Sequence, residues 1–380
     1  MKKKTIYYWS PFLTEIATVK AVINSAFSLK KFSDKYNVSI IEAGGEFREK
    51  NEDILKKNIN LIKLSKVSYA KYLPKYGKIF SRISFLIIFI LSFFPLKKVI
   101  KDHKPDYILI HLITSLPLIL FFLFNFHTKC ILRISGYPEM GKLRIFFWKL
   151  VLKNVYLVTC PTFGTYNHLK KLNIVPKYKL KVLYDPVIIV NDFIKKKNIS
   201  HNYLFKNYAI AIGRLTKQKN FIFLISSYKR LLKELPNLNL IIIGNGEEKE
   251  MLNREIILRS LEDKIKILDY QENIFPLLKN AKCFFMPSLW EDPGFVLLES
   301  SFMRCFVITS NCKNGPEEII QNNNAGLLFE KNNIDDFINK IQLFKSLNKH
   351  QKKFYKLNAL RACKPFTLFS HGKELEKILN

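Results

Sequence analysis

The sequence predicts an α/β protein of two domains, each a parallel β-sheet covered by helices on both faces. A chain of 380 residues is long enough for two domains of ordinary size, each with its own core. Short apolar runs alternate with segments of helical period, most clearly in the C-terminal half. Glycine-containing turns follow several of these runs, which is typical of strand-to-helix connections in parallel sheets.

Five apolar runs in the C-terminal half are short enough to be buried strands. They are Tyr208–Ile212, Leu238–Ile243, Ile265–Leu268, Cys283–Met286 and Phe306–Thr309. The segments between them have helical spacing, the clearest being the set Phe221, Leu224, Ile225, Tyr228, Leu231 and Leu232. Strand and helix therefore alternate throughout this half, as in a doubly covered parallel sheet.

The N-terminal half has the same pattern in a less regular form. Expected strands are Thr5–Trp9, Val38–Glu42, Asn60–Leu64, Tyr107–Leu112, Cys130–Ile134 and Leu157–Cys160. The stretch 184–202 lacks a clear period, which indicates a connection between domains. We predict a first domain over 1–190, a linker over 191–206, a second domain over 207–360 and a C-terminal helix over 361–380 that crosses back to the first domain.

The chain is strongly basic, and the excess lies in the first half. It holds 62 Lys+Arg against 31 Asp+Glu, a net charge of +31. Residues 1–200 have 35 basic and 12 acidic side chains, whereas residues 201–380 have 27 and 19. Such a field favours an anionic partner, which on composition alone is a lipid surface, a nucleic acid or a phosphorylated substrate.

The six cysteines are scattered and form no C-x-x-C pair or zinc-type cluster. This argues against a disulfide framework or a structural metal and fits a reducing cytoplasm. The basic N-terminus is followed by a short apolar stretch that Pro11 and Glu15 interrupt, so we expect a first strand and not a signal peptide.

Two apolar stretches raise the question of a membrane. Ile83–Leu96 has about fourteen residues, fewer than the roughly 20 of a spanning helix. Tyr107–Phe126 is longer, but His111, Pro117 and Asn125 interrupt it, and a buried strand followed by a buried helix is favoured there. We therefore expect core elements and no membrane span.

The region from Lys56 to Lys104 contains twelve basic residues interleaved with aromatic ones. Basic residues with exposed aromatics dock on anionic membrane surfaces, where each charge contributes about 1 kcal/mol. The alternative is a solvated basic face over an ordinary core helix. We favour docking.

One segment of the C-terminal half, Gly213 to Asn220 (GRLTKQKN), follows a strand and opens a helix. Gly213 permits a tight turn at the strand's carboxyl end, where open α/β sheets bind ligands. Arg214 and Lys219 place two cations there, as a diphosphate requires. A second turn of this kind, with Gly244 and Gly246 in IGNGE, would let a ligand approach the backbone, although a lone G-x-G often marks only a turn.

The segment Trp290 to Ser300 (WEDPGFVLLES) places Glu291 on a loop and Glu299 in the helix that follows. Backbone N–H groups of Phe295–Leu298 would form an anion site at the helix start. The two carboxylates would accept hydrogen bonds from paired hydroxyls, as a sugar and a ribose present them.

These segments, with SNCKNGPEEI, resemble the donor-binding signature of glycosyltransferase family 4 over about residues 207–340. Two glutamates with seven residues between them are the hallmark of that family. The resemblance implies a GT-B fold, two Rossmann-like domains facing each other across a cleft. It also implies a retaining transferase that uses a nucleotide-sugar as substrate and needs no cofactor or metal, in keeping with the absence of a D-x-D motif.

The resemblance also implies residue roles. Arg214 and Lys219 would hold the donor diphosphate and stabilise the leaving nucleotide. Glu291 would bind hydroxyls of the transferred sugar, and Glu299 those of the ribose. Backbone contacts near the phosphate, sugar and nucleoside would come from Gly213, Gly244, Gly246, Gly294, Phe295 and Val296.

The N-terminal half departs from the family pattern. The usual glycine pair after the first strand is missing from the stretch 10–15, and the first pair is Gly44-Gly45. Arg133-Ile134-Ser135-Gly136 occupies the place of the family's usual histidine. His111, at a strand end, is then the best candidate for a sugar contact, the alternative being a histidine of the core.

The expected function is transfer of a sugar to a glycan or polyprenyl-diphosphate-linked acceptor in bacterial surface polysaccharide (O-antigen or capsule) synthesis, at the cytoplasmic face of the membrane. An alternative is other chemistry on the same fold, such as a nucleotide-sugar epimerase or a soluble-sugar synthase. A nucleic-acid-binding protein is less favoured, because no zinc finger, RNA-binding signature or helix-turn-helix is evident.

Overall fold

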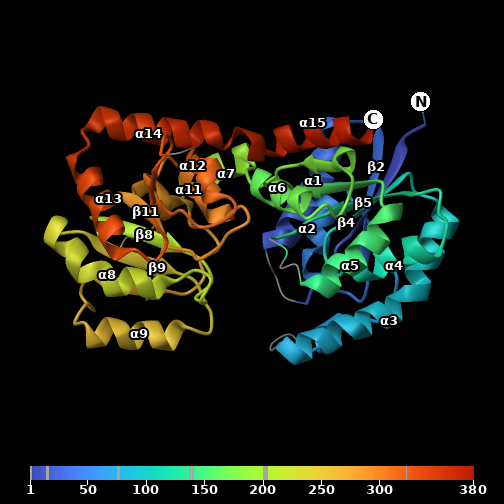
Figure 1. Ribbon diagram of the computed structural model, residues 1–380, viewed down its shortest axis with the longest axis horizontal. Helices are drawn as coiled ribbons and strands as arrows, with labels where there is room; N and C mark the ends of the chain where they lie inside the picture. Colours follow the sequence, from blue (N-terminus) through green and yellow to red (C-terminus); the bar gives the residue numbers. More distant parts are fainter. Residues whose placement is uncertain are drawn as a thin grey trace. The chain divides into compact units, whose positions relative to one another are not determined.

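The computed structural model describes residues 2–13, 17–74, 78–136, 138, 141–199, 204–321 and 323–380. The chain divides into two compact units. The first comprises Met1–Pro186 together with Leu368–Asn380, and the second comprises Val187–Thr367. Figure 1 shows that each unit is a sheet with helices packed on its faces.

The first unit contains a parallel sheet, with seven strands among the described residues in the order β3-β2-β1-β4-β5-β6-β7. Strands such as β4 are buried along their whole length, as expected of a sheet covered on both faces. The strands are β1 Lys4–Trp9, β2 Tyr36–Glu42, β3 Asn60–Lys63, β4 Tyr107–Ile110, β5 Lys129–Arg133, β6 Leu157–Cys160 and β7 Leu180–Val182.

Two helical layers cover this sheet. Side chains of alternate residues point to opposite faces of a strand, so Ile6 and Tyr8 pack with α1, α2 and α15. Tyr7 and Trp9 pack on the other side with α3, α4, α5 and α6. The helices are α1 Ala17–Phe32, α2 Asn51–Lys56, α3 Lys78–His103, α4 Ser115–Leu123, α5 Lys142–Val151, α6 Phe163–Lys171 and α15 Leu368–Leu379.

The second unit contains a parallel sheet in the order β10-β9-β8-β11-β12-β13. Its strands are β8 Tyr208–Ile212, β9 Asn239–Ile243, β10 Ile265–Leu268, β11 Cys283–Met286, β12 Val307–Ser310 and β13 Leu327–Phe329. Its helices are α7 Val190–Lys196, α8 Phe221–Glu234, α9 Lys249–Leu258, α10 Phe275–Asn280, α11 Phe295–Phe302, α12 Pro316–Ile320, α13 Ile334–Ser346 and α14 Lys349–Ala362. The predicted apolar side of α8 is confirmed, since it packs into the core of this unit.

Some boundaries differ from the sequence-based ones. The second unit begins at Val187, and α7 (Val190–Lys196) begins one residue before the segment expected to be a linker over 191–206. Residues 200–203 of that segment lie outside the described residues. The C-terminal helix α15 begins at Leu368, not at 361, and it packs against α1 in the first unit. The strands β7 and β13 have three residues each and were not predicted.

The apolar stretch expected to be a core helix over 83–96 is part of the much longer α3 (Lys78–His103). This helix is long and apolar enough to cross a bilayer. Only 22% of its most apolar 18-residue segment is buried. The expected core helix is therefore longer than predicted, and only one side of it is buried, where Ile88, Leu96 and Ile100 belong to the core of the first unit. The second apolar stretch forms β4 followed by the largely buried α4, as predicted.

Candidate functional site

Four loops follow the strands β8, β9, β11 and β12 of the second unit. Because these strands are parallel, their loops meet at one edge of the sheet, where α/β folds bind ligands. The loop after β8 hydrogen-bonds to the loop after β9 through Leu215 N–H and Asn245 O (2.9 Å). It also accepts a hydrogen bond from the loop after β11, between Leu289 N–H and Gln218 O (2.8 Å). The loop after β8 thus joins its two neighbours.

The glycines of IGNGE permit two backbone segments to cross. A Cβ atom on Gly244 would lie 1.8 Å from the carbonyl oxygen of Gly213, and one on Gly246 would lie 2.2 Å from that of Leu215. Gly244 also has a φ of +152°, which favours glycine. The sequence suggested that these glycines admit a ligand, whereas the structure shows that they admit the neighbouring loop. A nucleoside contact stays a prediction.

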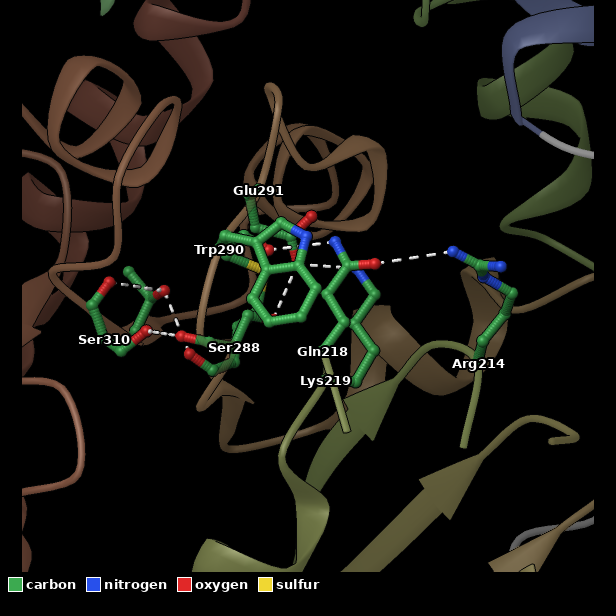
Figure 2. A network of polar contacts seen from close by, with 9 residues as sticks. Arg214, Gln218, Lys219, Ser288, Trp290, Glu291 and Ser310 are labelled. Carbon is green, nitrogen blue, oxygen red and sulfur yellow. Dashed lines mark hydrogen bonds and ion pairs between the residues drawn. The ribbon is translucent and has the colours of Figure 1, made fainter. Parts of the chain in front are cut away.

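Lys219 and Glu291 form an ion pair at this edge (Figure 2). The distance from Nζ to Oε1 is 2.5 Å, and the two side chains are 15% and 5% exposed. Ser288 Oγ donates a second hydrogen bond to the same carboxylate oxygen (2.6 Å), and Ser310 Oγ donates to the Ser288 carbonyl (2.6 Å). Buried charges are stable when paired and hydrogen-bonded, so each charge holds the other in place.

This pairing was not expected from the sequence, which assigned Lys219 to a diphosphate and Glu291 to sugar hydroxyls. The structure brings the two side chains together although they are 72 residues apart in the chain. A ligand diphosphate in this place would compete with Glu291 for the ammonium group of Lys219. Binding of a ligand diphosphate by Lys219 stays a prediction.

Gln218 connects Arg214 to the loop that carries Glu291 and was not singled out by sequence reasoning. Its Nε2 donates to the carbonyl oxygen of Trp290 (2.9 Å), and its Oε1 lies 3.4 Å from Arg214 Nη2 (Figure 2). Arg214 itself is exposed. The one available signal was its position between Arg214 and Lys219, inside the GRLTKQKN segment.

The helix α11 begins at Phe295, directly after Gly294, whose φ is +96°. The N–H groups of Leu297 and Leu298 donate to the Gly294 carbonyl (3.1 and 3.4 Å). The expected anion-binding N–H groups over Phe295–Leu298 are therefore narrowed to Phe295 and Val296. These carry the positive end of the helix dipole.

Glu299 lies four residues after Phe295, on the same side of α11, and is half-buried. The structure thus places one carboxylate, Glu291, in the loop before α11 and the other within that helix. Both belong to the connection between β11 and β12. A sugar and a ribose that bridge this connection would each meet one carboxylate.

Cys312, whose thiol lies close enough to Glu291 and Lys219 to feel their charges, is not an activated thiol. Burial, and then the charge of Glu291, raise the pKa of the Cys312 thiol to about 12, so it stays protonated at neutral pH. Within the described ranges no three His, Cys, Asp or Glu side chains come together as metal ligands. Independence from a metal stays a prediction.

His111 of the first unit is buried at the end of β4 and stacks on Tyr8, with 5.9 Å between ring centroids. Its Nε2 has no hydrogen-bond partner among the described residues, and neither does Ser10 Oγ at the end of the neighbouring strand β1. Burial lowers the pKa of His111 well below its ordinary value, and Arg133 and His371 lower it further. His111 is therefore neutral, and its contact with a sugar stays a prediction.

Arg133, at the place of the family's usual histidine, is part of an internal network. Its Nη2 lies 2.7 Å from Asp185, and its Nη1 donates to the Leu183 carbonyl. The side chain is almost fully buried. In the glycine-free stretch 10–15, Thr14 and Glu15 lie outside the described residues.

Residues 192–360 match the family of glycosyl transferases group 1. The chain is 32% identical over 250 residues to an uncharacterized glycosyltransferase of Methanocaldococcus jannaschii. The match covers 59% of this chain and 60% of that protein. It is also 26% identical over 317 residues, 83% of each chain, to a Campylobacter jejuni protein. That protein is named GalNAc-alpha-(1->4)-GalNAc-alpha-(1->3)-diNAcBac-PP-undecaprenol alpha-1,4-N-acetyl-D-galactosaminyltransferase.

Among solved structures, the chain is similar to Anabaena HepE in complex with UDP and glucose. The TM-score is 0.72 at 14% identity, over 99% of each chain, so this likeness concerns the fold. The chain spans about three fifths of the M. jannaschii relative and most of the other two proteins. It thus has the two Rossmann-like domains of the GT-B fold, and its second unit is similar to the glycosyl transferases of group 1.

Proposed function

We propose that this chain is a retaining glycosyltransferase of family 4 that takes its sugar from a nucleoside-diphosphate-sugar. One observation carries the proposal: the Lys219–Glu291 pair lies at the carboxyl edge of the second sheet, in loops shared with Arg214 and the start of α11. Two cations and a helix N-terminus suit a diphosphate. The carboxylates of Glu291 and Glu299 suit the hydroxyl groups of the sugar and the ribose.

In the proposed reaction, the bond between the anomeric carbon and the diphosphate oxygen breaks. The acceptor oxygen bonds to the same face of that carbon, and its proton passes to the leaving diphosphate. Negative charge grows on the diphosphate in the transition state, where Arg214, Lys219 and the N–H groups of Phe295 and Val296 would stabilise it. This route uses no protein nucleophile and no metal.

We further propose that the acceptor is a polyprenyl-diphosphate-linked glycan in surface polysaccharide synthesis, at the cytoplasmic face of the membrane. The C. jejuni relative is named for a substrate linked to undecaprenol through a diphosphate. The concentration of positive charge in residues 1–200 suits a phosphorylated lipid and an anionic membrane surface. The six cysteine side chains are buried thiols, as suits a reducing compartment.

The donor site is tested by the thermal stability of the whole chain with UDP, GDP, ADP and their sugars. A ligand at 100 times its Kd raises the unfolding free energy by about 2.7 kcal/mol, and a unit of this size gains several degrees in Tm. Arg214→Ala and Glu299→Ala should lose this shift. Arg230→Ala, an exposed arginine on α8 paired with Asp335, is the matched control and should keep it. No shift with any nucleotide would contradict the proposal.

The stereochemistry is tested by NMR of the product formed from the donor so identified and a polyprenyl-diphosphate glycan. Retention predicts that the new linkage has the anomeric configuration of the donor. An inverted linkage would leave the donor site intact and remove the assignment to family 4.

A further inference from the structure

Helix α3 carries large apolar side chains on its outer side as well as on the side that packs against the protein. Its buried positions recur every four residues and include two serines: Ser84, Ile88, Ser92, Leu96 and Ile100. Ser84 Oγ donates to the Pro74 carbonyl (2.7 Å), so this side is hydrogen-bonded to the protein. The exposed side carries Phe80 (58% exposed), Leu86 (58%), Ile90 (60%) and Phe94 (73%). A helix whose outer side faces water carries polar and charged residues on that side.

Two neighbouring helices, α4 and α5, also carry exposed apolar side chains. On α5, Leu143, Phe146 and Leu150 are exposed and, at spacings of three and four, lie on one side of the helix. Helix α4 packs against both α3 and α5, and its last residues, Phe122 and Leu123, are also exposed (Figure 1). We refer to the outer side of α3, α4 and α5 as the α3–α5 face.

Positive charge accompanies these side chains. The sequences of the three helices hold eight Lys and Arg residues against one acid, Asp102. Exposed cations lie toward both ends of α3, at Arg82 and at Lys98 and Lys101, and others lie along α5 at Lys142, Arg144 and Lys149. Apolar side chains with adjacent cations are the composition of a helix that lies in the interface of an anionic bilayer.

Other occupants match this face less well. A second copy of the chain, related by a two-fold axis, would place the same cations against each other. A nucleic acid would match the charge but would leave the phenylalanine and leucine side chains without an apolar partner.

A membrane-spanning position for α3 does not suit its surroundings. The stripe from Ser84 to Ile100 packs against the first unit, and Ile88, Leu96 and Ile100 belong to its core. Four residues after the helix ends, the chain enters β4 near the middle of the sheet. One side of α3 is therefore covered by its own domain, and lipid can reach only the other side.

We propose that the α3–α5 face docks on the surface of an anionic bilayer, with α3 lying in the plane of the interface. The proposal deepens the function proposed above, because the diphosphate of a lipid-linked acceptor lies at the depth of the headgroups. Docking is measured without donor or acceptor, so its failure is distinguishable from failure of the transferase assignment.

Flotation of the whole chain with vesicles tests the docking. We expect the protein to float with phosphatidylglycerol–phosphatidylcholine vesicles and to be released by high salt, with much weaker flotation on phosphatidylcholine alone. The triple variant Leu86→Asn/Ile90→Asn/Phe94→Ser should lose at least about tenfold in vesicle affinity. Its far-UV circular dichroism and the Tm of the free protein should match those of the parent, which shows that it folds.

Two further variants separate charge from apolar contact. Lys98→Glu/Lys101→Glu should weaken binding to the anionic vesicles by at least about tenfold, since one cation near such a surface contributes about fivefold. The matched control is Ile257→Asn/Leu258→Asn, which removes two exposed apolar side chains from α9 in the second unit and should float like the parent. Equal losses in this control would overturn the assignment to the α3–α5 face.

The depth of α3 is tested with Phe80→Trp and Phe94→Trp and quenching by brominated lipids. These positions are about 21 Å apart along the helix axis. An in-plane helix places both at the same shallow depth, whereas a spanning helix places them at different depths. Different depths, absence of flotation at low salt, or a dimer in sedimentation that the triple variant dissociates would each overturn the proposal.

Discussion

The cations at the carboxyl edges of the two sheets differ in how far they are exposed. In the second unit, Arg214 is exposed, and Lys219, the cation of the ion pair, is 15% exposed. In the first unit, Arg133 is almost fully buried and is paired with Asp185. Both sheets are parallel, so the topology does not cause the difference. A charge at a sheet edge is available to a ligand only where the fold leaves it unburied.

The first unit uses its edge to hold its own chain together. His371 of α15 donates from Nδ1 to the Tyr184 carbonyl (2.6 Å), because a carbonyl oxygen can only accept. Its Nε2 then accepts from Ser25 Oγ of α1 (2.7 Å). This network ties α15 to α1 and to the segment after β7. Arg133 lowers the pKa of His371, and His371 in turn lowers that of His111.

The largest expected effect comes from Lys219→Ala. Loss of a cation that meets the developing diphosphate charge should lower kcat per folded molecule by about 10²–10³-fold. The variant also leaves the buried carboxylate of Glu291 without its ion-pair partner, so the unfolding free energy should fall as well. Steady-state kinetics with the identified donor check the loss in kcat. Lys217→Ala, an exposed lysine of the same loop, should leave kcat near the parent value.

Arg133→Ala is the counterpart in the first unit. It leaves Asp185 with no ion-pair partner in a largely buried place, so the unfolding free energy should fall by about 3–5 kcal/mol. The kcat per folded molecule should change little. A variant of normal stability with a kcat as low as that of Lys219→Ala would break the comparison between the two edges.

The next effect is on the pH dependence of stability. Burial lowers the pKa of His371 to about 3, from an ordinary value of 6.5, so the histidine is neutral in the folded chain. The unfolded chain takes up the proton below pH 6.5, and stability present above that pH is lost as the pH falls toward 3. Between pH 7 and pH 5 the loss is about 2 kcal/mol for this group, and His111 adds to it in the same direction.

Hydrogen exchange with mass spectrometry resolves this effect by region. Protection of the first-unit strands should fall between pH 7 and pH 5 more than protection of the second-unit strands, after correction for the intrinsic exchange rate. His371→Gln should flatten the dependence. Equal losses in both units would show that these histidines do not control it.

The smallest effect is expected for Gln218→Ala. The side chain makes one hydrogen bond to Trp290 O and a longer contact with Arg214, worth about 1 kcal/mol together. Because it positions Arg214 and the Glu291 loop, kcat/KM should fall about fivefold to tenfold with a small change in Tm. Gln271→Ala, which removes a hydrogen bond within another loop of the second unit, is the control. A larger loss of Tm than of kcat/KM would assign Gln218 a structural role.

Much of the fold could be predicted because its signals are local. Runs such as Cys283–Met286 are apolar along their whole length and correspond to buried strands. The strands β7 and β13 could not be predicted, because three residues are too few to show a period. Helix α3 could be predicted in part, since composition indicates an apolar helix but does not say which side of it meets the core.

By itself the sequence determined the α/β class, the order of the elements and the segments that follow β8, β9 and β11. Each of these rests on residue period or spacing within a few turns of chain. The tertiary structure alone decided that Lys219 pairs with Glu291, that Gly244 admits a neighbouring loop, and that α3 turns apolar side chains outward. These features depend on which distant segments meet at a sheet edge or cover a helix, and no local pattern encodes that contact.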